Sequence, residues 1–292
     1  MSINRERNGH KSRQGQKSHF SAKSASTKPE SGGRERSETK PKTPQIQRHK
    51  VSEDGWIWGV HAVEAALKNS ARKGPFQLFA TEDRAKALPQ ALIRRSDLNF
   101  RPTPMADFMR ILPQGAVHQG IALNAPPPEG DDLEALMRDH GVLLMLDQVT
   151  DPQNVGAIFR SSAAFGVQGL IMQDRHSPVM QGVLAKTAAG AMDMVPFAKV
   201  TNLSRALENL RDEGWISIGL AGNTDDTLQG VLNTLPQPRK VVLVLGSEGD
   251  GLRRLVAEHC DHLAKIPMPG GFESLNVSHA ASIALYEACA RN

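Results

Sequence analysis

Two runs of consecutive apolar residues, 142–146 and 241–245, constrain the fold of this chain more than any other feature. A strand covered on one face alternates apolar and polar residues, whereas a strand of a parallel sheet covered on both faces is continuously apolar. Helix-spaced apolar positions separate these runs from further expected strands at 169–172 and 215–220. Residues 141–292 are therefore predicted to form an α/β domain with a parallel sheet between helical layers.

A smaller α/β module is expected before this domain, in residues 53–125. Apolar runs predict strands at Phe76–Ala80 and Gly120–Leu123, and helices are expected around Ala85–Arg95 and Met105–Leu112. Two ordinary modules of this size are consistent with the length of the chain.

Two further segments, 1–52 and 126–140, have compositions unlike those of the modules. Residues 1–50 carry 13 Lys and Arg against 4 Asp and Glu, with very few apolar residues. Such a segment cannot bury enough apolar surface to fold, so a disordered basic tail is predicted. Its positive charge would let this tail bind a polyanion such as RNA, although a tail that only increases solubility would have the same composition. The proline-rich, acidic residues 126–140 are typical of a stiff linker.

Several classes of protein are disfavoured by composition. No apolar run approaches the roughly 18 residues of a membrane span, and the amino terminus lacks the apolar core of a signal peptide. Cys260 and Cys289 belong to no Cys/His cluster, which argues against a disulfide framework or a zinc site. We therefore expect a cytoplasmic protein with two buried, unreactive thiols and no membrane contact.

The loops after the expected strands are the place to look for chemistry, because parallel sheets bind ligands at the carboxyl ends of their strands. The first loop leads into a helix that contains Asn154, Gly156 and Arg160. Asp151 is expected to cap this helix, and Pro152 suits its first turn. Gly156 and Arg160 share a helix face, which predicts room for a ligand beneath the guanidinium. A surface arginine and a packing glycine explain the same residues equally well.

The second loop, residues 245–252, reads Leu-Gly-Ser-Glu-Gly-Asp-Gly-Leu. Its glycines predict tight turns and close approach of the backbone to a ligand. The spacing is not the Gly-x-Gly-x-x-Gly of dinucleotide-binding loops, and Glu248 and Asp250 would repel a pyrophosphate. A nucleotide-binding oxidoreductase is therefore disfavoured, and a ligand with a cation or sugar hydroxyls is favoured.

The third loop, residues 266–278, reads Ile-Pro-Met-Pro-Gly-Gly-Phe-Glu-Ser-Leu-Asn-Val-Ser. Such a loop offers backbone amides and carbonyls to a ligand, with Ser274 and Asn276 as polar anchors. Either residue could instead serve as a simple helix cap.

The three loops together, in this order and spacing, resemble the SpoU (TrmH-like) family of RNA ribose 2′-O-methyltransferases, within the SPOUT superfamily. The resemblance covers about residues 55–290. Gly-Val-His-Ala-Val at 59–63 and Val-His-Gln-Gly at 117–120 resemble the RNA-binding module of the members that methylate a guanosine of 23S ribosomal RNA.

The resemblance implies a carboxy-terminal domain with a deep trefoil knot, which ordinary topology rules would not predict. It implies S-adenosylmethionine as cofactor, ribosomal RNA as partner, a homodimer with sites at the subunit interface, and no metal. By resemblance, Arg160, Asn154, Glu248 and Asn276 are catalytic, with Asn154 orienting Arg160. Substrate contacts are expected from Arg160 and Ser274. The expected cofactor-binding residues are Leu220, Gly246, Ile266, Met268, Leu275 and Asn276.

The expected reaction requires removal of the proton of a ribose 2′-hydroxyl and alignment of its oxygen with the donor methyl. The family assigns this task to the residue that matches Arg160, either as base or as positioner. A guanidinium hardly loses its proton in a protein, so an anchor for phosphate and developing oxyanion is physically easier.

Two alternatives to methylation of a 23S guanosine stay open at this point. A transfer-RNA methyltransferase of the same family would share all three loops, although the separate RNA-binding module argues against it. A non-catalytic RNA-binding ribosome-assembly factor would not need the set formed by Asn154, Arg160, Glu248 and Asn276.

Overall fold

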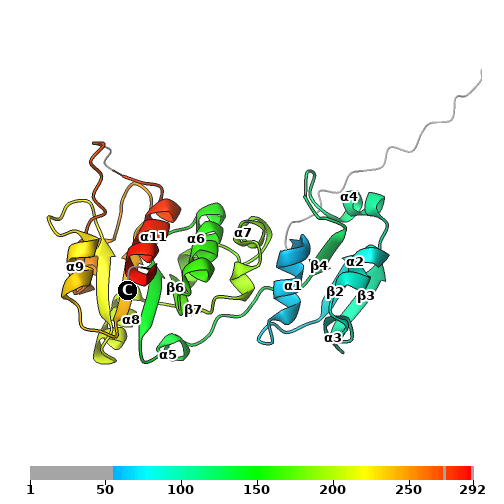
Figure 1. Ribbon diagram of the computed structural model, residues 1–292, viewed down its shortest axis with the longest axis horizontal. Helices are drawn as coiled ribbons and strands as arrows, with labels where there is room; N and C mark the ends of the chain where they lie inside the picture. Colours follow the sequence, from blue (N-terminus) through cyan, green and yellow to red (C-terminus); the bar gives the residue numbers. More distant parts are fainter. Residues whose placement is uncertain (1–54, 272–273, 291–292) are drawn as a thin grey trace, which may run out of the picture. The chain divides into compact units, whose positions relative to one another are not determined.

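The computed structural model describes residues 55–271 and 274–290. This part of the chain builds a six-stranded and a four-stranded sheet (Figure 1). The basic tail expected in residues 1–52 lies outside the described residues. Within the described part, no helix combines the length and the apolar character needed to cross a bilayer.

The six-stranded sheet has the order β10-β8-β9-β5-β6-β7, and all its neighbouring strands are parallel. The central strands β5 and β9 pair in register from Gly141 with Lys240 to Leu146 with Leu245. These two strands are the apolar runs of the sequence, so the predicted parallel α/β fold is confirmed. The strands are β5 (Gly141–Leu146), β6 (Gly169–Gln173), β7 (Phe197–Val200), β8 (Ile216–Leu220), β9 (Lys240–Leu245) and β10 (His262–Ala264).

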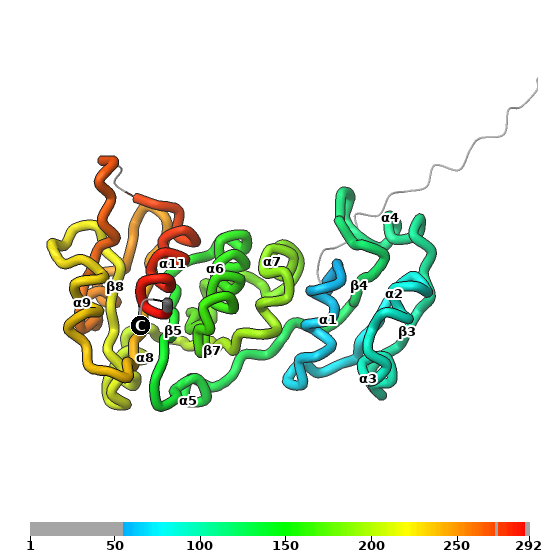
Figure 2. The backbone as a smooth tube through the Cα atoms, in the orientation of Figure 1, coloured from blue at the N-terminus to red at the C-terminus, as the bar shows by residue number. Residues whose placement is uncertain are grey.

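Helices cover both faces of this sheet, which is why its central strands are apolar throughout. Leu144 and Leu243 pack in the core beneath α6 and α11, whereas Leu143 and Val242 face α8 and α10. The helices α6 and α11 lie side by side (Figure 2) and are joined by the Ser161 and Ser282 hydroxyls at 2.7 Å. The helical segments are α5 (Leu133–Leu136), α6 (Pro152–Phe165), η2 (Asp174–His176), α7 (Gly182–Ala188), η3 (Ala191–Asp193), α8 (Leu203–Asp212), α9 (Leu228–Thr234), α10 (Arg254–His259), α11 (Val277–Leu285) and the π-helical turn η4 (Tyr286–Ala290).

The four-stranded sheet has the order β1-β4-β2-β3, with β2 and β3 parallel and the other pairs antiparallel. The helix expected over Ala85–Arg95 is two short helices, because Pro89 has no N–H to donate and the residue before it is extended. The elements are β1 (Trp56–Trp58), α1 (Val60–Lys68), β2 (Phe76–Ala80), α2 (Glu82–Ala87), α3 (Gln90–Ile93), β3 (Leu98–Pro102), η1 (Met105–Asp107), α4 (Phe108–Ile111) and β4 (Ile121–Asn124).

The segment 126–140, expected to be a linker, is packed against the larger sheet. It contains α5, whose Leu133 and Leu136 are buried in the core under α8, and Asp131 bridges to Ala198 of β7. These two leucines anchor the segment to the larger sheet.

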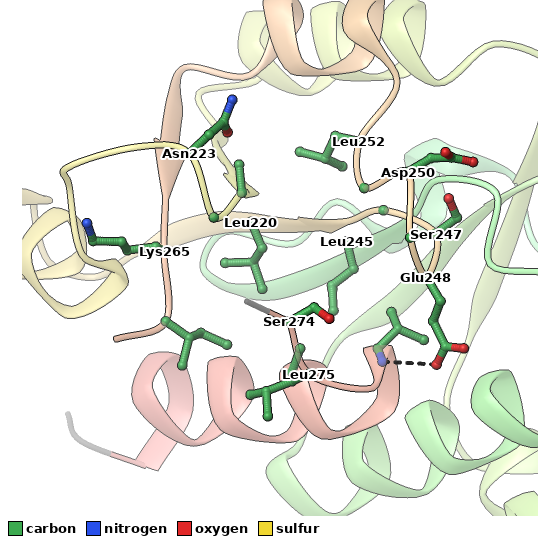
Figure 3. Close-up of a pocket in the computed structure, with 18 of the residues that line it drawn as sticks. Leu220, Asn223, Leu245, Ser247, Glu248, Asp250, Leu252, Lys265, Ser274 and Leu275 are labelled. Atoms are coloured by element: carbon green, nitrogen blue, oxygen red, sulfur yellow. Dashed lines mark hydrogen bonds between the residues drawn. The ribbon is translucent and has the colours of Figure 1, made fainter. Parts of the chain in front are cut away.

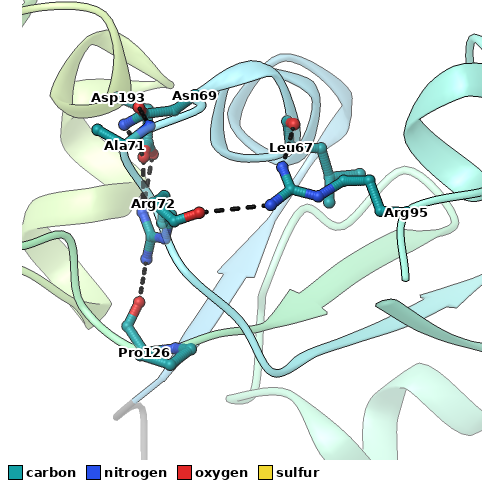
Figure 4. Close-up of polar contacts among 7 residues, drawn as sticks. All are labelled: Leu67, Asn69, Ala71, Arg72, Arg95, Pro126 and Asp193. Carbon is teal, nitrogen blue, oxygen red and sulfur yellow. Dashed lines mark hydrogen bonds and ion pairs between the residues drawn. The ribbon is translucent and has the colours of Figure 1, made fainter. Parts of the chain in front are cut away.

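A buried ion pair joins the residues after α1 to η3 (Figure 4). Arg72 Nη1 donates to both carboxylate oxygens of Asp193, at 2.8 and 2.9 Å, and its Nη2 donates to the carbonyl oxygen of Pro126 at 2.8 Å. The side chains of Arg72 and Asp193 are 1% and 2% exposed. A charge pair so deeply buried is tolerated because hydrogen bonds replace the lost water.

Candidate functional site

The loop after β9 closes on itself directly beyond the carboxyl end of the strand. Ser247 and Gly251 exchange two backbone hydrogen bonds, each of 3.1 Å. Gly249 and Gly251 have φ angles of 93° and 66°, which side chains rarely adopt. A methyl group on Gly246 would overlap the backbone of Gly251. The glycines predicted to form tight turns therefore have distinct roles: two bend the chain, and Gly246 permits its close approach.

Asp147 fixes the end of this loop to the neighbouring strand. It follows β5, it is fully buried, and it accepts hydrogen bonds from Arg253 Nε at 2.7 Å and from the Arg253 backbone N–H at 2.9 Å. Asp147 was not among the residues expected at the site. The sequence did contain a signal for this contact, because a carboxylate directly follows the apolar run 142–146.

Asn276 begins α11 and links the third loop to the other two. Its Oδ1 accepts from the backbone N–H groups of Ser278 at 3.0 Å and His279 at 3.4 Å, which is a helix cap. Its Nδ2 donates to Glu248 Oε1 at 2.6 Å and to Asn154 Oδ1 at 3.0 Å. The cap and the contact with the other loops are thus made by opposite ends of one side-chain amide.

Asn154 completes this cluster from the first turn of α6. Asp151 caps that helix and Pro152 occupies its first turn, as the sequence predicted. Asn154 Nδ2 donates to Glu248 Oε1 at 3.0 Å. The structure therefore brings together Asn154, Glu248 and Asn276, one from each loop, around a single carboxylate oxygen.

A cavity of about 880 Å³ opens beside this cluster, at the carboxyl ends of β8 and β9 (Figure 3). All six residues expected to bind a cofactor line it, and so does the expected substrate residue Ser274. Leucines form its apolar walls, while Glu248 and Asp250 place carboxylates on its rim. Its labelled lining residues are Leu220, Asn223, Leu245, Ser247, Glu248, Asp250, Leu252, Lys265, Ser274 and Leu275.

Two lining residues, Asn223 and Lys265, were missed by the sequence analysis. Asn223 follows β8, and Lys265 follows β10. Their position in the loops that follow strands was the available signal, because the carboxyl ends of parallel strands meet at one edge.

Arg160 lies apart from this cluster. It is exposed on α6 and is not among the residues that line the cavity, and within the described part of the chain its side chain forms no hydrogen bond or ion pair. The side-chain amide of Asn154 bonds Glu248 and Asn276, so it does not orient Arg160 as expected.

The ligand space expected beneath Arg160 is absent at Gly156. A methyl group there would stand 2.7 Å from Thr187 Cβ and 2.8 Å from the Leu184 carbonyl oxygen of α7. Gly156 therefore permits α6 and α7 to pack closely, and the expectation of a ligand pocket at this point was wrong.

Among the residues that the structure describes, no group of three or more His, Cys, Asp or Glu side chains is placed to hold a metal ion. The polar chemistry of the cavity comes from amides, hydroxyls, the carboxylates of Glu248 and Asp250, and the cationic side chains of Arg254 and Lys265.

Comparison with known proteins relates both modules to RNA methyltransferases. The SpoU rRNA methylase family model matches residues 141–286, and the family model described as RNA 2′-O ribose methyltransferase substrate binding matches residues 56–130. The 23S rRNA (guanosine-2′-O-)-methyltransferase RlmB of Pseudomonas aeruginosa is 41% identical over 79% of this chain and 94% of its own length. The RlmB of Escherichia coli is 38% identical over 80% of this chain and 96% of its own length.

Solved structures of TrmH and SpoU methyltransferases have the same fold as this chain. A putative RNA methyltransferase of the TrmH family from Porphyromonas gingivalis superposes with a TM-score of 0.66 and 27% identity, over 81% of this chain and 90% of that one. The SpoU methyltransferase AviRb from Streptomyces viridochromogenes, solved with AdoMet, has the same fold, with a TM-score of 0.65 at 21% identity over 81% of this chain and 89% of its own.

The parallel sheet with its three-loop cluster, preceded by a matching substrate-binding module, defines an RNA 2′-O-ribose methyltransferase. The chain belongs to the SpoU rRNA methylase family.

Proposed function

We propose that this enzyme methylates the ribose 2′-hydroxyl of a guanosine in 23S ribosomal RNA, with S-adenosylmethionine as donor. The observation that carries the proposal is the cluster of Asn154, Glu248 and Asn276 on one rim of the cavity. The proposal is supported by relatives: the chain is 38–41% identical to RlmB enzymes over nearly their whole length. Ribosomal RNA as substrate makes the cytoplasm the expected compartment.

The cavity residues fit the proposed cofactor in size and chemistry. A cavity of about 880 Å³ accommodates a nucleoside-sized ligand. Leu220, Leu245 and Leu275 offer apolar walls, and the carboxylates of Glu248 and Asp250 favour a cation and sugar hydroxyls. S-adenosylmethionine supplies a methyl group already activated by its sulfonium. The chain's own task is then to bind the donor, exclude water and align the ribose oxygen.

We assign Arg160 the role of positioner rather than base. Its guanidinium is exposed, so it can reach an RNA phosphate. A guanidinium is also a poor base in proteins. A fixed positive charge near the ribose stabilises the negative charge that develops on the 2′-oxygen. Ser274, on the cavity rim, is proposed as a second substrate contact.

Because Arg160 lies away from the cavity of its own chain, the proposal includes a homodimer that shares its sites. Arg160 is on α6, and the adjacent α11 and η4 expose Ile283 and Tyr286 by 39% and 48%. A second copy that covers this apolar surface would bring its own cavity toward Arg160. The trefoil knot expected from the family resemblance is part of the same proposal.

The decisive experiment mixes two inactive variants, Arg160→Ala and Glu248→Ala, which each lack one part of the site. If sites are shared, a mixed dimer has one site with both wild-type residues, and mixing restores methyl transfer to 23S rRNA. If each chain carries a complete site, mixing restores nothing and the shared dimer is rejected. Arg205→Ala, an exposed arginine on α8, is the matched control and should remain active.

The substrate assignment is tested separately by mapping ribose methyl groups in cells without the protein. A single guanosine of 23S rRNA should lose its 2′-O-methyl group. Loss of a methyl group from a transfer RNA, or from no RNA, would overturn this assignment. Arg160→Ala should bind S-adenosylmethionine nearly as well as the wild type but transfer no methyl group.

A further inference from the structure

The small module presents two rows of side chains on one face of its sheet. Strand register places Arg101, Phe79, Ala122 and Trp58 in one cross-strand row, and Asn99, Gln77, Asn124 and Trp56 in the next. Side chains alternate between the faces of a strand, so both rows point to the same side. The opposite face, with Phe76, Leu78 and Ala80, is buried under α1, α2 and α3.

The helix α4 covers only part of this face. Its Phe108 and the following Leu112 pack with Trp58 and Ala122 at one end of the first row. The remainder is open: Gln77, Asn99 and Arg101 are exposed, while Phe79 and Trp56 are half-buried. The uncovered part therefore consists of aromatic, amide and guanidinium groups rather than aliphatic side chains.

The two half-buried aromatic rings lie next to each other with the guanidinium alongside. The ring centroids of Trp56 and Phe79 are 5.1 Å apart and inclined by 52°. The guanidinium carbon of Arg101 is 5.7 Å from the Phe79 centroid, which is a cation–π contact. No described carboxylate forms an ion pair with Arg101, and neither row contains an acidic residue. The positive charge is therefore free to meet an anion.

We propose that Trp56, Phe79 and Arg101 form a stacking platform for unpaired RNA bases, a proposal that rests on the proposed RNA substrate. Single-stranded RNA is bound by other sheets through aromatic rings that stack on bases, with arginine and amide groups beside them. The amides of Gln77, Asn99 and Asn124 can donate to and accept from base edges. The module's match to a substrate-binding family model supports this occupant.

Charge outside the sheet favours the same occupant. Residues 1–50, which carry 13 Lys and Arg against 4 Asp and Glu, come before this module in the sequence. Positive charge of this density in the same chain favours a polyanion such as RNA as the partner. Unpaired bases are required because a duplex hides its base faces from the rings.

Tryptophan fluorescence can test the platform directly. The chain has three tryptophans, and Trp58 and Trp215 are 8% and 1% exposed, which leaves Trp56 as the one a base could reach. An unpaired oligoribonucleotide of about 12 nucleotides should quench the fluorescence of the full chain. Trp56→Phe should abolish the quenching but keep most of the affinity, because phenylalanine still stacks. A duplex of the same sequence should quench far less.

Binding affinities of variants provide a second test of the platform. Phe79→Ala should weaken binding of the oligoribonucleotide about tenfold to a hundredfold, the usual effect of losing one stacking ring. Arg101→Ala should also weaken binding of the oligoribonucleotide. The control is Arg94→Ala, which removes the same charge from an exposed arginine after α3, on the helix-covered side of the sheet. This control should not change the affinity. If Arg101→Ala binds like Arg94→Ala, or if duplex and single strand quench equally, the platform is rejected.

Controls separate this proposal from the proposed function. Arg101→Ala and Trp56→Phe should retain the wild-type thermal midpoint, and every variant that folds should bind S-adenosylmethionine normally, because the platform lies in the other module. If Phe79→Ala does not fold, Arg101→Ala and Trp56→Phe still decide the question. Wild-type enzyme that methylates 23S rRNA but shows no quenching would contradict the platform alone, whereas failure to methylate would contradict the proposed function.

Discussion

Asn276 donates its side-chain amide to Glu248 at 2.6 Å, and this bond joins the loop before α11 to the loop after β9. Asn154 donates to the same carboxylate oxygen at 3.0 Å. One oxygen therefore holds three segments that are far apart in the sequence. The rim of the cavity depends on this shared acceptor more than on any single loop.

Glu248→Ala is expected to destabilise the fold by about 1–3 kcal/mol, because two side-chain amides lose their acceptor. Glu248→Gln keeps an acceptor oxygen and should cost less. The free energy of unfolding in urea measures both effects. Glu258→Ala, which breaks an exposed ion pair with Arg254, is the control and should change stability by less than about 1 kcal/mol. Equal effects of Glu248→Ala and Glu258→Ala would show that the shared acceptor is unimportant.

Gly246→Ala should prevent the loop after β9 from closing, because the added methyl overlaps the backbone of Gly251. We expect a loss of about 1–3 kcal/mol in stability and much weaker binding of S-adenosylmethionine, measured by calorimetry. Gly270→Ala is the matched control, since a methyl group there meets no atom of the described residues within 4 Å. Binding by Gly246→Ala at the wild-type level would refute this account of the turn.

Arg72→Ala should cost about 3–5 kcal/mol, because it leaves the Asp193 carboxylate buried without its cation. Its neighbour Lys73 is 82% exposed and 3.9 Å from Glu129, so Lys73→Ala should change stability by less than about 1 kcal/mol. Thermal and denaturant unfolding compare the two. A small effect at Arg72 would mean that water enters and solvates Asp193 once the guanidinium is gone.

Both thiols should resist alkylation in the folded protein. Burial, together with nearby Asp261, raises the pKa of Cys260 to about 12, and burial raises the pKa of Cys289 to about 11. Since the thiolate is the reactive form, iodoacetamide at pH 8 should react at least roughly a hundredfold more slowly than with a free cysteine. The rate should rise as pH increases toward these values. Rapid modification of the native protein, at the rate seen in denaturant, would contradict the burial.

Strands and helix starts in this protein follow from local sequence. The runs 142–146 and 241–245 could only be strands covered on both faces, and Asp151 with Pro152 marked the start of α6. The three loops could be placed at the same edge of the sheet, because the carboxyl ends of parallel strands coincide. These features depend on short-range patterns that a single segment contains.

The partners of the polar side chains were decided by tertiary structure alone. Asn154 was expected to orient Arg160 six residues away, yet it contacts Glu248 and Asn276, which are 94 and 122 positions distant. Likewise, Gly156 looked like space for a ligand but is filled by α7. Sequence spacing gives the face of a helix on which a residue lies, but it does not give what packs against that face. That depends on how the sheet folds distant segments together, because hydrogen bonds and close packing act only over a few ångströms.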